Sequence, residues 1–136
     1  MKKKILIVSA PYYKNVVEQL TEGAKKYLNN HANLEIHEIT APGAFEIPFV
    51  VNQNINKYDG FIVLGCIIRG ETYHFELIAN EVSRKIMDLS ISSNKPIGFG
   101  ILTCENMEQA YARSNVLKKD KGGEAAKACY EILLNG

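Results

Sequence analysis

Residues 61–65 read Phe-Ile-Val-Leu-Gly, and every side chain before the glycine is apolar. A strand that is covered on both faces has this continuous apolar pattern, whereas a strand with one face in water alternates apolar and polar residues. Short runs of similar composition recur at residues 5–8, 34–39 and 97–102, and the run 34–39 alternates. We therefore expect four strands, with 5–8 and 61–64 in the middle of a sheet and 34–39 at an edge.

The segments between these runs have apolar residues at steps of three or four, which is the spacing of an amphipathic helix. The stripes consist of Val17, Leu20, Ala24, Tyr27 and Leu28; Val50, Val51 and Ile55; Phe75, Ile78, Val82, Ile86 and Leu89; and Ala125, Cys129, Ile132 and Leu133. Another short helix is predicted after Asn106, because asparagine is a favourable N-cap. Strands that alternate with helices pair in parallel through right-handed crossovers. The sequence therefore predicts an α/β fold in which a four-stranded parallel sheet lies between two helical layers.

Length and composition restrict the class of protein. The chain has 136 residues, 46% hydrophobic and 23% charged, which favours one globular domain over residues 1–136. Its formal charge of +1 gives no basic excess for nucleic acid. No run approaches the roughly 20 apolar residues of a membrane span. Three cysteines without a CxxC pair favour a reduced cytoplasmic protein, in which Cys66 is a buried thiol rather than a nucleophile. His31, His37 and His74 are not at metal-ligand spacing.

In open α/β sheets, ligands bind beyond the carboxyl ends of the strands. The most informative segment in such a position is 65–74, Gly-Cys-Ile-Ile-Arg-Gly-Glu-Thr-Tyr-His. We predict that Gly65 ends a strand and that Thr72 caps the next helix, whose free N–H groups attract phosphate or carboxylate. His74 then lies in the first helical turn, where the helix dipole favours a neutral imidazole that can exchange protons. The alternative is that His74 is an ordinary solvated helix residue.

Other strand ends offer further candidates, each with a structural alternative. Glu46 follows a Pro-Gly turn and either accepts hydrogen bonds from a polar ligand or acts as an acid in the first turn of a helix. Tyr12 and Tyr13 either present a ring to a planar ligand or pack on the following helix. Phe99, taken alone, is more typical of a core. Arg113 either binds phosphate in a bidentate manner or lies on the surface.

Four segments spread over nearly the whole chain form a specific combination: PGAFEIP at 42–48, GCIIRGETYHFELIANE at 65–81, GFGILTCENMEQAYARS at 98–114 and KGGEAA at 121–126. In this order they resemble the lumazine synthase family. The resemblance implies a flavodoxin-like, three-layer α/β/α sandwich. It also implies the condensation of 5-amino-6-(D-ribitylamino)uracil with 3,4-dihydroxy-2-butanone 4-phosphate to 6,7-dimethyl-8-ribityllumazine. This penultimate step of riboflavin biosynthesis releases phosphate and water and uses no metal and no organic cofactor.

The resemblance also implies which residues bind the aminouracil. Tyr12 matches the aromatic residue that stacks on the pyrimidinedione, and Phe99 matches an aromatic residue that closes the pocket over the ring. The remaining matches are to residues that bind the ribityl chain or contact the ring, largely through backbone groups. They are Ala44, Phe45 and Glu46 for the ribityl chain, and Cys66, Ile67 and Ile68 for the ring.

A second set of matches concerns the butanone phosphate and the chemistry. Glu71 and Thr72 match the turn that holds the phosphate, and Arg113 matches the phosphate-binding arginine. His74 matches the catalytic histidine, and Lys121 matches a pocket lysine. In the family, this arginine and lysine, like the aromatic residue that closes the pocket, come from the neighbouring subunit. The resemblance therefore implies a homopentamer with active sites at subunit interfaces, small-molecule substrates, and riboflavin synthase as a further partner.

The chain departs from many members of the family at three places. Pro11 stands where an arginine often precedes the stacking aromatic residue, so any interaction of that arginine is lost. Cys66 stands where threonine is frequent, which is tolerable if only the backbone is used. The chain begins with its first predicted strand, without the extension that adds a strand to a neighbour's sheet in many relatives. We therefore do not expect shells larger than a pentamer.

Three alternative functions stay open at this point. An archaeal-type riboflavin synthase has the same fold but dismutates two lumazine molecules, and it needs no phosphate site. The presence of Glu71, Thr72 and Arg113 argues against it. A noncatalytic flavin- or lumazine-binding protein has no need of His74 or Arg113, and both are present. A structural shell protein is the third and weakest alternative.

Overall fold

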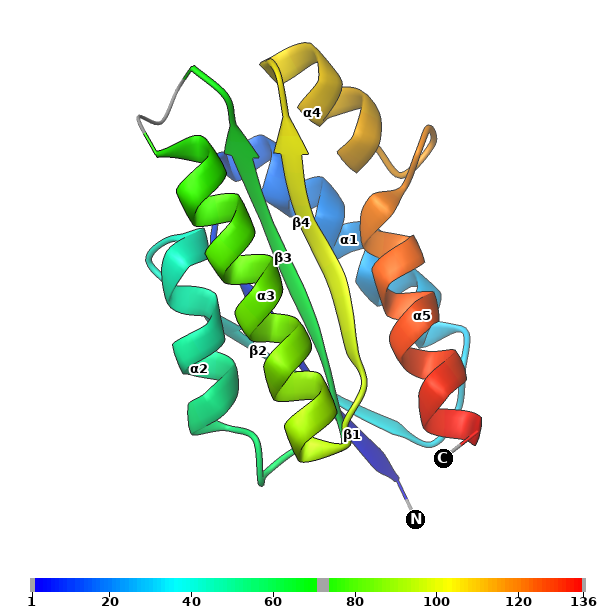
Figure 1. Cartoon of the computed structure of the whole chain (residues 1–136). Coiled ribbons are helices and arrows are strands. Elements are labelled where there is room, and N and C mark those ends of the chain that lie inside the picture. The colour runs from blue at the N-terminus through cyan, green and yellow to red at the C-terminus, as the bar shows by residue number, and fades with distance from the viewer. Residues whose placement is uncertain (1, 71–73, 136) are drawn as a thin grey trace.

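The computed structural model describes residues 2–70 and 74–135. Within these residues, four strands form one parallel sheet in the order β2-β1-β3-β4 (Figure 1). The strands are β1 (Lys3–Ser9), β2 (Leu34–Thr40), β3 (Gly60–Ile68) and β4 (Ile97–Cys104). The predicted edge position of β2 and the predicted central positions of β1 and β3 are confirmed.

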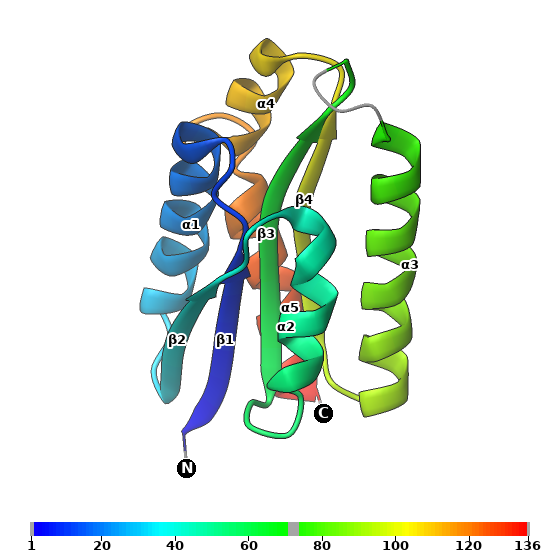
Figure 2. The ribbon, with the colours of Figure 1, turned by 90° about the vertical axis from the view of Figure 1, so that its left-hand side faces the viewer.

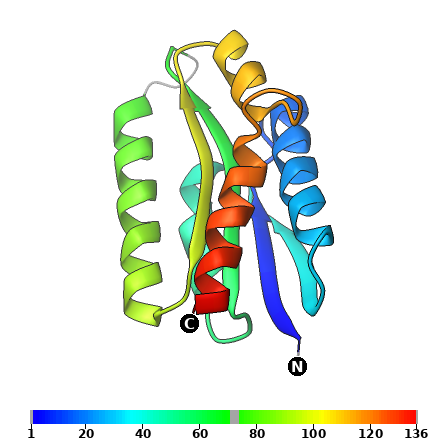
Figure 3. The same cartoon turned by 90° about the vertical axis from the view of Figure 1, so that its right-hand side faces the viewer.

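Helices cover both faces of this sheet. They are α1 (Lys14–Asn29), the 3-10 helix η1 (Ala44–Glu46), α2 (Ile47–Gln53), α3 (Phe75–Ser93), α4 (Met107–Ser114) and α5 (Lys121–Asn135). Helices α1 and α5 lie on one face, and α2 and α3 lie on the other (Figure 2, Figure 3). This arrangement confirms the α/β class and the three-layer α/β/α sandwich. In the described parts of the chain, no helix is long and apolar enough to cross a lipid bilayer.

Alternate side chains of the central strands enter two separate cores. In β1, Ile5 and Ile7 belong to the core that includes residues of α1 and α5, whereas Leu6 and Val8 belong to the core that includes residues of α2 and α3. All four side chains are buried. Because successive residues of a strand point to opposite faces, a strand between two helical layers is apolar at every position. In β2, by contrast, no residue is fully buried.

The prediction that Gly65 ends a strand is wrong. Strand β3 continues through Cys66, Ile67 and Ile68, which pair with residues 102–104 of β4. These three side chains are apolar and buried, and the partner strand extends alongside them. A buried apolar segment with a paired neighbour continues the ladder, because leaving its backbone groups unpaired costs free energy.

Two glycines allow α5 to approach both β4 and α1 closely. A Cβ atom at Gly98 of β4 would lie 2.0 Å from the carbonyl oxygen of Ala125. A Cβ atom at Gly122 would lie 2.0 Å from the carbonyl oxygen of Leu20 in α1. The KGGEAA segment at 121–126 therefore has a packing role in the subunit, apart from any contact with a ligand.

Candidate active site

A cavity of about 290 Å³ lies at the carboxyl ends of β1 and β3. Its walls come from the segment after β1, the turn after β2, the last residues of β3 and the first turn of α3. The lining residues are Tyr12, Tyr13, Gly43, Ala44, Phe45, Glu46, Cys66, Ile67, Ile68 and Ile78. They include every residue predicted to bind the aminouracil except Phe99. The parallel sheet brings these separate segments together because its strands end at the same edge.

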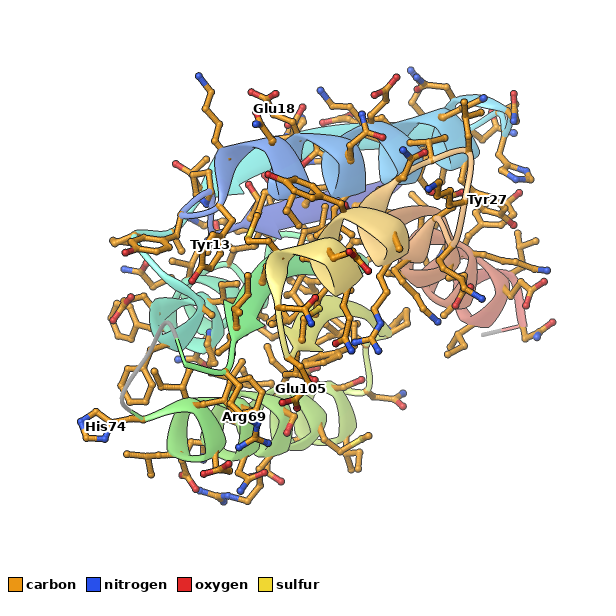
Figure 4. The ribbon with its side chains drawn as sticks, turned by 90° about the horizontal axis from the view of Figure 1, so that it is seen from above. Tyr13, Glu18, Tyr27, Arg69, His74 and Glu105 are labelled. Carbon is orange, nitrogen blue, oxygen red and sulfur yellow. The ribbon has the colours of Figure 1, made fainter. Side chains whose placement is uncertain are left out.

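The two tyrosines after β1 have different environments. Tyr12 is 77% exposed, and its ring meets that of Tyr13 edge-to-face with the centroids 4.9 Å apart. Tyr13 packs against the core that contains Val16 and Leu20 of α1 (Figure 4). Of the two roles considered for these residues, Tyr13 therefore packs on the helix, and Tyr12 has an open ring surface at the cavity.

The turn after β2 positions Glu46 at the rim of the cavity. The backbone N–H of Glu46 donates a hydrogen bond of 3.1 Å to the carbonyl of Gly43, where the chain is extended. A Cβ atom on Gly43 would lie 3.0 Å from Oε1 of Glu46, so the carboxylate lies close to this glycine. Glu46 is the N-cap residue of α2 but makes no side-chain capping hydrogen bond. Its exposed carboxylate is an acceptor for hydroxyl or N–H groups.

His74 lies directly before α3. The helix begins at Phe75, because the backbone of His74 (φ −115°, ψ 43°) is not helical. The prediction that His74 lies within the first turn of the helix is therefore wrong, because His74 is its N-cap residue. The carbonyl of His74 accepts a 2.9 Å hydrogen bond from the N–H of Ile78, and its exposed side chain lies at the periphery of the molecule (Figure 4). The predicted phosphate-binding residues Glu71 and Thr72 lie outside the described residues.

Arg69 connects the start of α3 to the end of β4. Its guanidinium forms ion pairs with Glu76 and, at 3.1 Å, with Glu105, and its Cζ lies 4.5 Å from the centre of the Phe75 ring (Figure 4). The hydrogen bonds to Glu76 and Glu105 raise the pKa of Arg69 above its usual value. Its backbone N–H donates to the carbonyl of Cys104 at 2.8 Å. The motif at 65–74 gives no indication of this network, because Glu105 is 36 residues away in the sequence.

Arg113, in the last turn of α4, extends to the end of β4. Its Nη1 donates to the carbonyl of Thr103 at 3.1 Å and to Sγ of Cys104 at 3.6 Å. Cys66 and Cys104 are free, buried thiols that are hydrogen-bonded to each other. That hydrogen bond, assisted by Arg113, lowers the pKa of Cys104 to about 7. The same hydrogen bond, followed by burial, raises the pKa of Cys66.

The subunit does not bring every predicted site residue to this cavity. Phe99 is 44% exposed and lines a different cavity of about 260 Å³ between α3 and β4. Lys121 pairs with Glu124 at 3.2 Å, and neither it nor Arg113 lines the first cavity. Among the residues that the structure describes, no three His, Cys, Asp or Glu side chains gather as the ligands of a metal would. Tyr13, Gly43 and Ile78 line the first cavity without having been assigned to it.

Comparison with known proteins identifies the family. Residues 2–135 match the family model described as 6,7-dimethyl-8-ribityllumazine synthase. The chain belongs to the lumazine synthase family. A lumazine synthase of Agrobacterium fabrum (strain C58 / ATCC 33970) is 47% identical over 139 residues, which cover 97% of this chain and 93% of the relative. A lumazine synthase of Bartonella tribocorum is 47% identical over 133 residues, which cover 94% of this chain and 87% of the relative. A lumazine synthase of Novosphingobium aromaticivorans is 47% identical over 132 residues, which cover 96% of this chain and 94% of the relative.

The lumazine synthase motifs lie around the first cavity. The segments 42–48 and 65–81 supply all of its lining residues except the two tyrosines. The lumazine synthase segment 98–114 instead contains Phe99 and Arg113, which lie elsewhere in the subunit. The family motifs therefore do not all lie at the first cavity of the subunit.

Proposed function

We propose that the chain carries out the lumazine synthase reaction in the cavity at the ends of β1 and β3. The enzyme is a transferase of riboflavin biosynthesis that condenses 5-amino-6-(D-ribitylamino)uracil with 3,4-dihydroxy-2-butanone 4-phosphate. The products are 6,7-dimethyl-8-ribityllumazine, phosphate and water. The observation that carries the proposal is the family match over residues 2–135, which includes every residue that lines this cavity.

The walls of the cavity suit the aminouracil. The open ring of Tyr12 provides a flat surface for a planar pyrimidinedione. The Glu46 carboxylate accepts hydrogen bonds from ribityl hydroxyls, beside the backbone of Ala44 and Phe45. Cys66, Ile67 and Ile68 present the end of β3 to the ring. The substrate therefore lies across the strand ends, with the ribityl chain toward η1.

The chemistry requires positioning and proton transfer. The amine of the uracil forms an imine with the ketone, phosphate is eliminated, and the ring closes with loss of water. Holding two reactants together supplies much of the rate, because a bimolecular step becomes effectively unimolecular. His74, exposed at the start of α3, exchanges protons with the reacting groups. The reaction uses no metal and no organic cofactor.

A neighbouring subunit completes the site. Phe99, Arg113 and Lys121 do not line the cavity of their own subunit, so they serve the cavity of the next one around a ring. Exposed apolar side chains support such an assembly, since Phe49 of α2 is 65% exposed and Leu77 of α3 is 57% exposed. The contact is head-to-tail, which closes into a ring. We propose a cytoplasmic homopentamer of single-domain subunits, with riboflavin synthase as the partner that consumes the product.

A product assay with purified protein tests the function. Both substrates are supplied, and 6,7-dimethyl-8-ribityllumazine and phosphate are measured against a reaction without protein and a tube that contains lumazine alone. We expect protein-dependent formation of lumazine and phosphate in equal amounts. Formation of riboflavin from lumazine alone would identify a dismutase instead. Binding of lumazine without any turnover would identify a noncatalytic binding protein.

A further inference from the structure

Three polar groups form a short row at the carboxyl end of β4. Sγ of Cys104 on β4 accepts a hydrogen bond of 3.6 Å from Nη1 of Arg113 on α4. The thiol of Cys66, on the adjacent strand β3, is close enough to lower the pKa of Cys104. Cys66 and Cys104 are only 6% and 1% exposed. The row therefore runs from the core of the subunit out to the guanidinium.

The contacts of Arg113 use only part of its hydrogen-bonding capacity. A guanidinium has five N–H donors in a planar, rigid arrangement. The described contacts involve Nη1 alone, which donates to the carbonyl of Thr103 and to the thiol of Cys104. Two acceptors on one nitrogen fix the plane of the group. The remaining N–H donors of the guanidinium have no described acceptor and can bind an anion in a bidentate manner.

The thiol pair makes the sulfur of Cys104 a directed acceptor. A thiol has one proton, and when Cys66 donates its own proton to Cys104, the sulfur of Cys104 is favoured as an acceptor. Arg113 lowers the pKa of Cys104 further, which is the expected effect of a nearby positive charge. A buried sulfur also cannot move as an exposed side chain does, because the packed core surrounds it. The contact between Arg113 and the sulfur of Cys104 is therefore in place before any anion binds.

We propose that Cys104 is a positioning residue that orients Arg113 for the phosphate group of the butanone substrate. This inference rests on the proposed function, in which Arg113 binds that phosphate in the neighbouring cavity. It assigns to the thiol pair a role in the affinity for phosphate, separate from its role in packing.

The test compares Cys104→Ala, Cys104→Ser and Cys129→Ala. Cys129 is a matched control, since it is a fully buried thiol in the same core whose sulfur lies near the carbonyl of Pro96 and not near Arg113. The probe is inorganic phosphate, and its dissociation constant is measured by calorimetry on the assembled protein. We expect Cys104→Ala to weaken phosphate binding about three- to tenfold, as for the loss of one hydrogen bond. Cys104→Ser, which keeps an acceptor, restores most of the affinity, and Cys129→Ala leaves it unchanged.

A double-mutant cycle separates positioning from general destabilisation. In an Arg113→Ala background, the further change Cys104→Ala is expected to have no effect on phosphate binding, because the group that it orients is gone. Equal affinities of Cys104→Ala and Cys129→Ala would overturn the inference, as would an undiminished effect in the Arg113→Ala background. A wild-type protein that does not bind phosphate also overturns it.

Failure of the proposed function is distinguishable from failure of this inference. The phosphate measurement does not depend on turnover, whereas the proposed function is tested by formation of lumazine. If the protein forms no lumazine but Cys104→Ala still weakens phosphate binding, the positioning of Arg113 for an anion stands, and the function and the assignment to the butanone substrate are wrong. If lumazine forms and the variants bind phosphate equally, the function stands and the inference is wrong.

Discussion

Cys104 has two close polar neighbours, the thiol of Cys66 and the guanidinium of Arg113. The hydrogen bond to Cys66 is the main cause that lowers the pKa of Cys104 to about 7, from a usual value of 9.0. Between these two pH values, the folded protein has lost a proton that the unfolded chain keeps. The free energy of unfolding therefore rises with pH across this interval. Above it, the raised pKa of Cys66 has the opposite effect, because the folded state then keeps a proton that the unfolded chain loses.

We predict that this pH dependence is absent from Cys104→Ser. Denaturant unfolding of the wild type and of this variant is measured from neutral to mildly alkaline pH, and the two free energies of unfolding are subtracted. The difference is expected to grow in favour of the wild type between about pH 7 and pH 9. Thiolate absorbance in the ultraviolet gives a second measurement, with one thiol titrating near pH 7 in the wild type only. Parallel curves for the two proteins would contradict the assignment.

The elements of the fold follow from local patterns, but their ends do not. The apolar run at 61–64 and the alternating run at 34–39 correctly predict a central strand and an edge strand. Gly65 suggested a strand end, yet β3 continues to Ile68, because its last residues pair with β4. The sequence also places His74 within α3, whereas the helix begins at Phe75. The end of a strand depends on pairing with segments that are distant in the sequence, and the local pattern of apolar and polar residues gives no information about that pairing.

Part of the candidate site could likewise be predicted from the sequence, and part could not. Tyr12, residues 44–46 and residues 66–68 each follow or end a strand, so their meeting at one edge could be predicted from the α/β alternation. The ion pair of Arg69 with Glu105 could not, because the two residues are 36 positions apart in the sequence. The contact of Arg113 with Cys104 is close in sequence, but it depends on side-chain geometry that the residue pattern does not specify. The resemblance to the family assigned a role to Arg113 but none to Cys104.

Arg69 joins two elements, and this gives a prediction for its removal. Arg69→Gln breaks the ion pairs with Glu76 and Glu105, so the start of α3 and His74 lose their connection to β4. We expect turnover to fall about two- to fivefold, in the range of exposed ion pairs that act as a network. Arg84→Gln is the control, because the described ion-pair partners of Arg84, Glu81 and Asp88, both lie within α3. Equal turnover numbers for the two variants would show that the Arg69 network does not position His74.

At the scale of the whole molecule, the predicted site residues of one subunit do not all lie at one cavity. The cavity at the strand ends has Tyr12 and Glu46, and His74 lies before the adjoining helix, but Phe99 and Arg113 lie elsewhere. In the proposed head-to-tail ring, Phe99 and Arg113 of one subunit lie at the cavity of the next. We therefore propose that each active site takes His74 from one chain and Arg113 from its neighbour.

Refolding a mixture of two impaired variants tests most directly whether each site takes His74 from one chain and Arg113 from its neighbour. His74→Ala removes the proton-transfer group and is expected to lower turnover more than about tenfold. Arg113→Ala removes a charge-assisted contact and is expected to weaken use of the phosphorylated substrate by about ten- to a hundredfold. The two variants are unfolded together, refolded in equal amounts, and assayed for 6,7-dimethyl-8-ribityllumazine. Each variant refolded alone is the control.

In a randomly mixed ring, about one quarter of the sites receive both an intact histidine and an intact arginine. We predict that the mixture recovers roughly this fraction of wild-type activity, while each variant refolded alone keeps about a tenth of it or less. If the mixture is no more active than the mean of the two variants, His74 and Arg113 act within one chain or not in one site, and the account of a shared site is wrong.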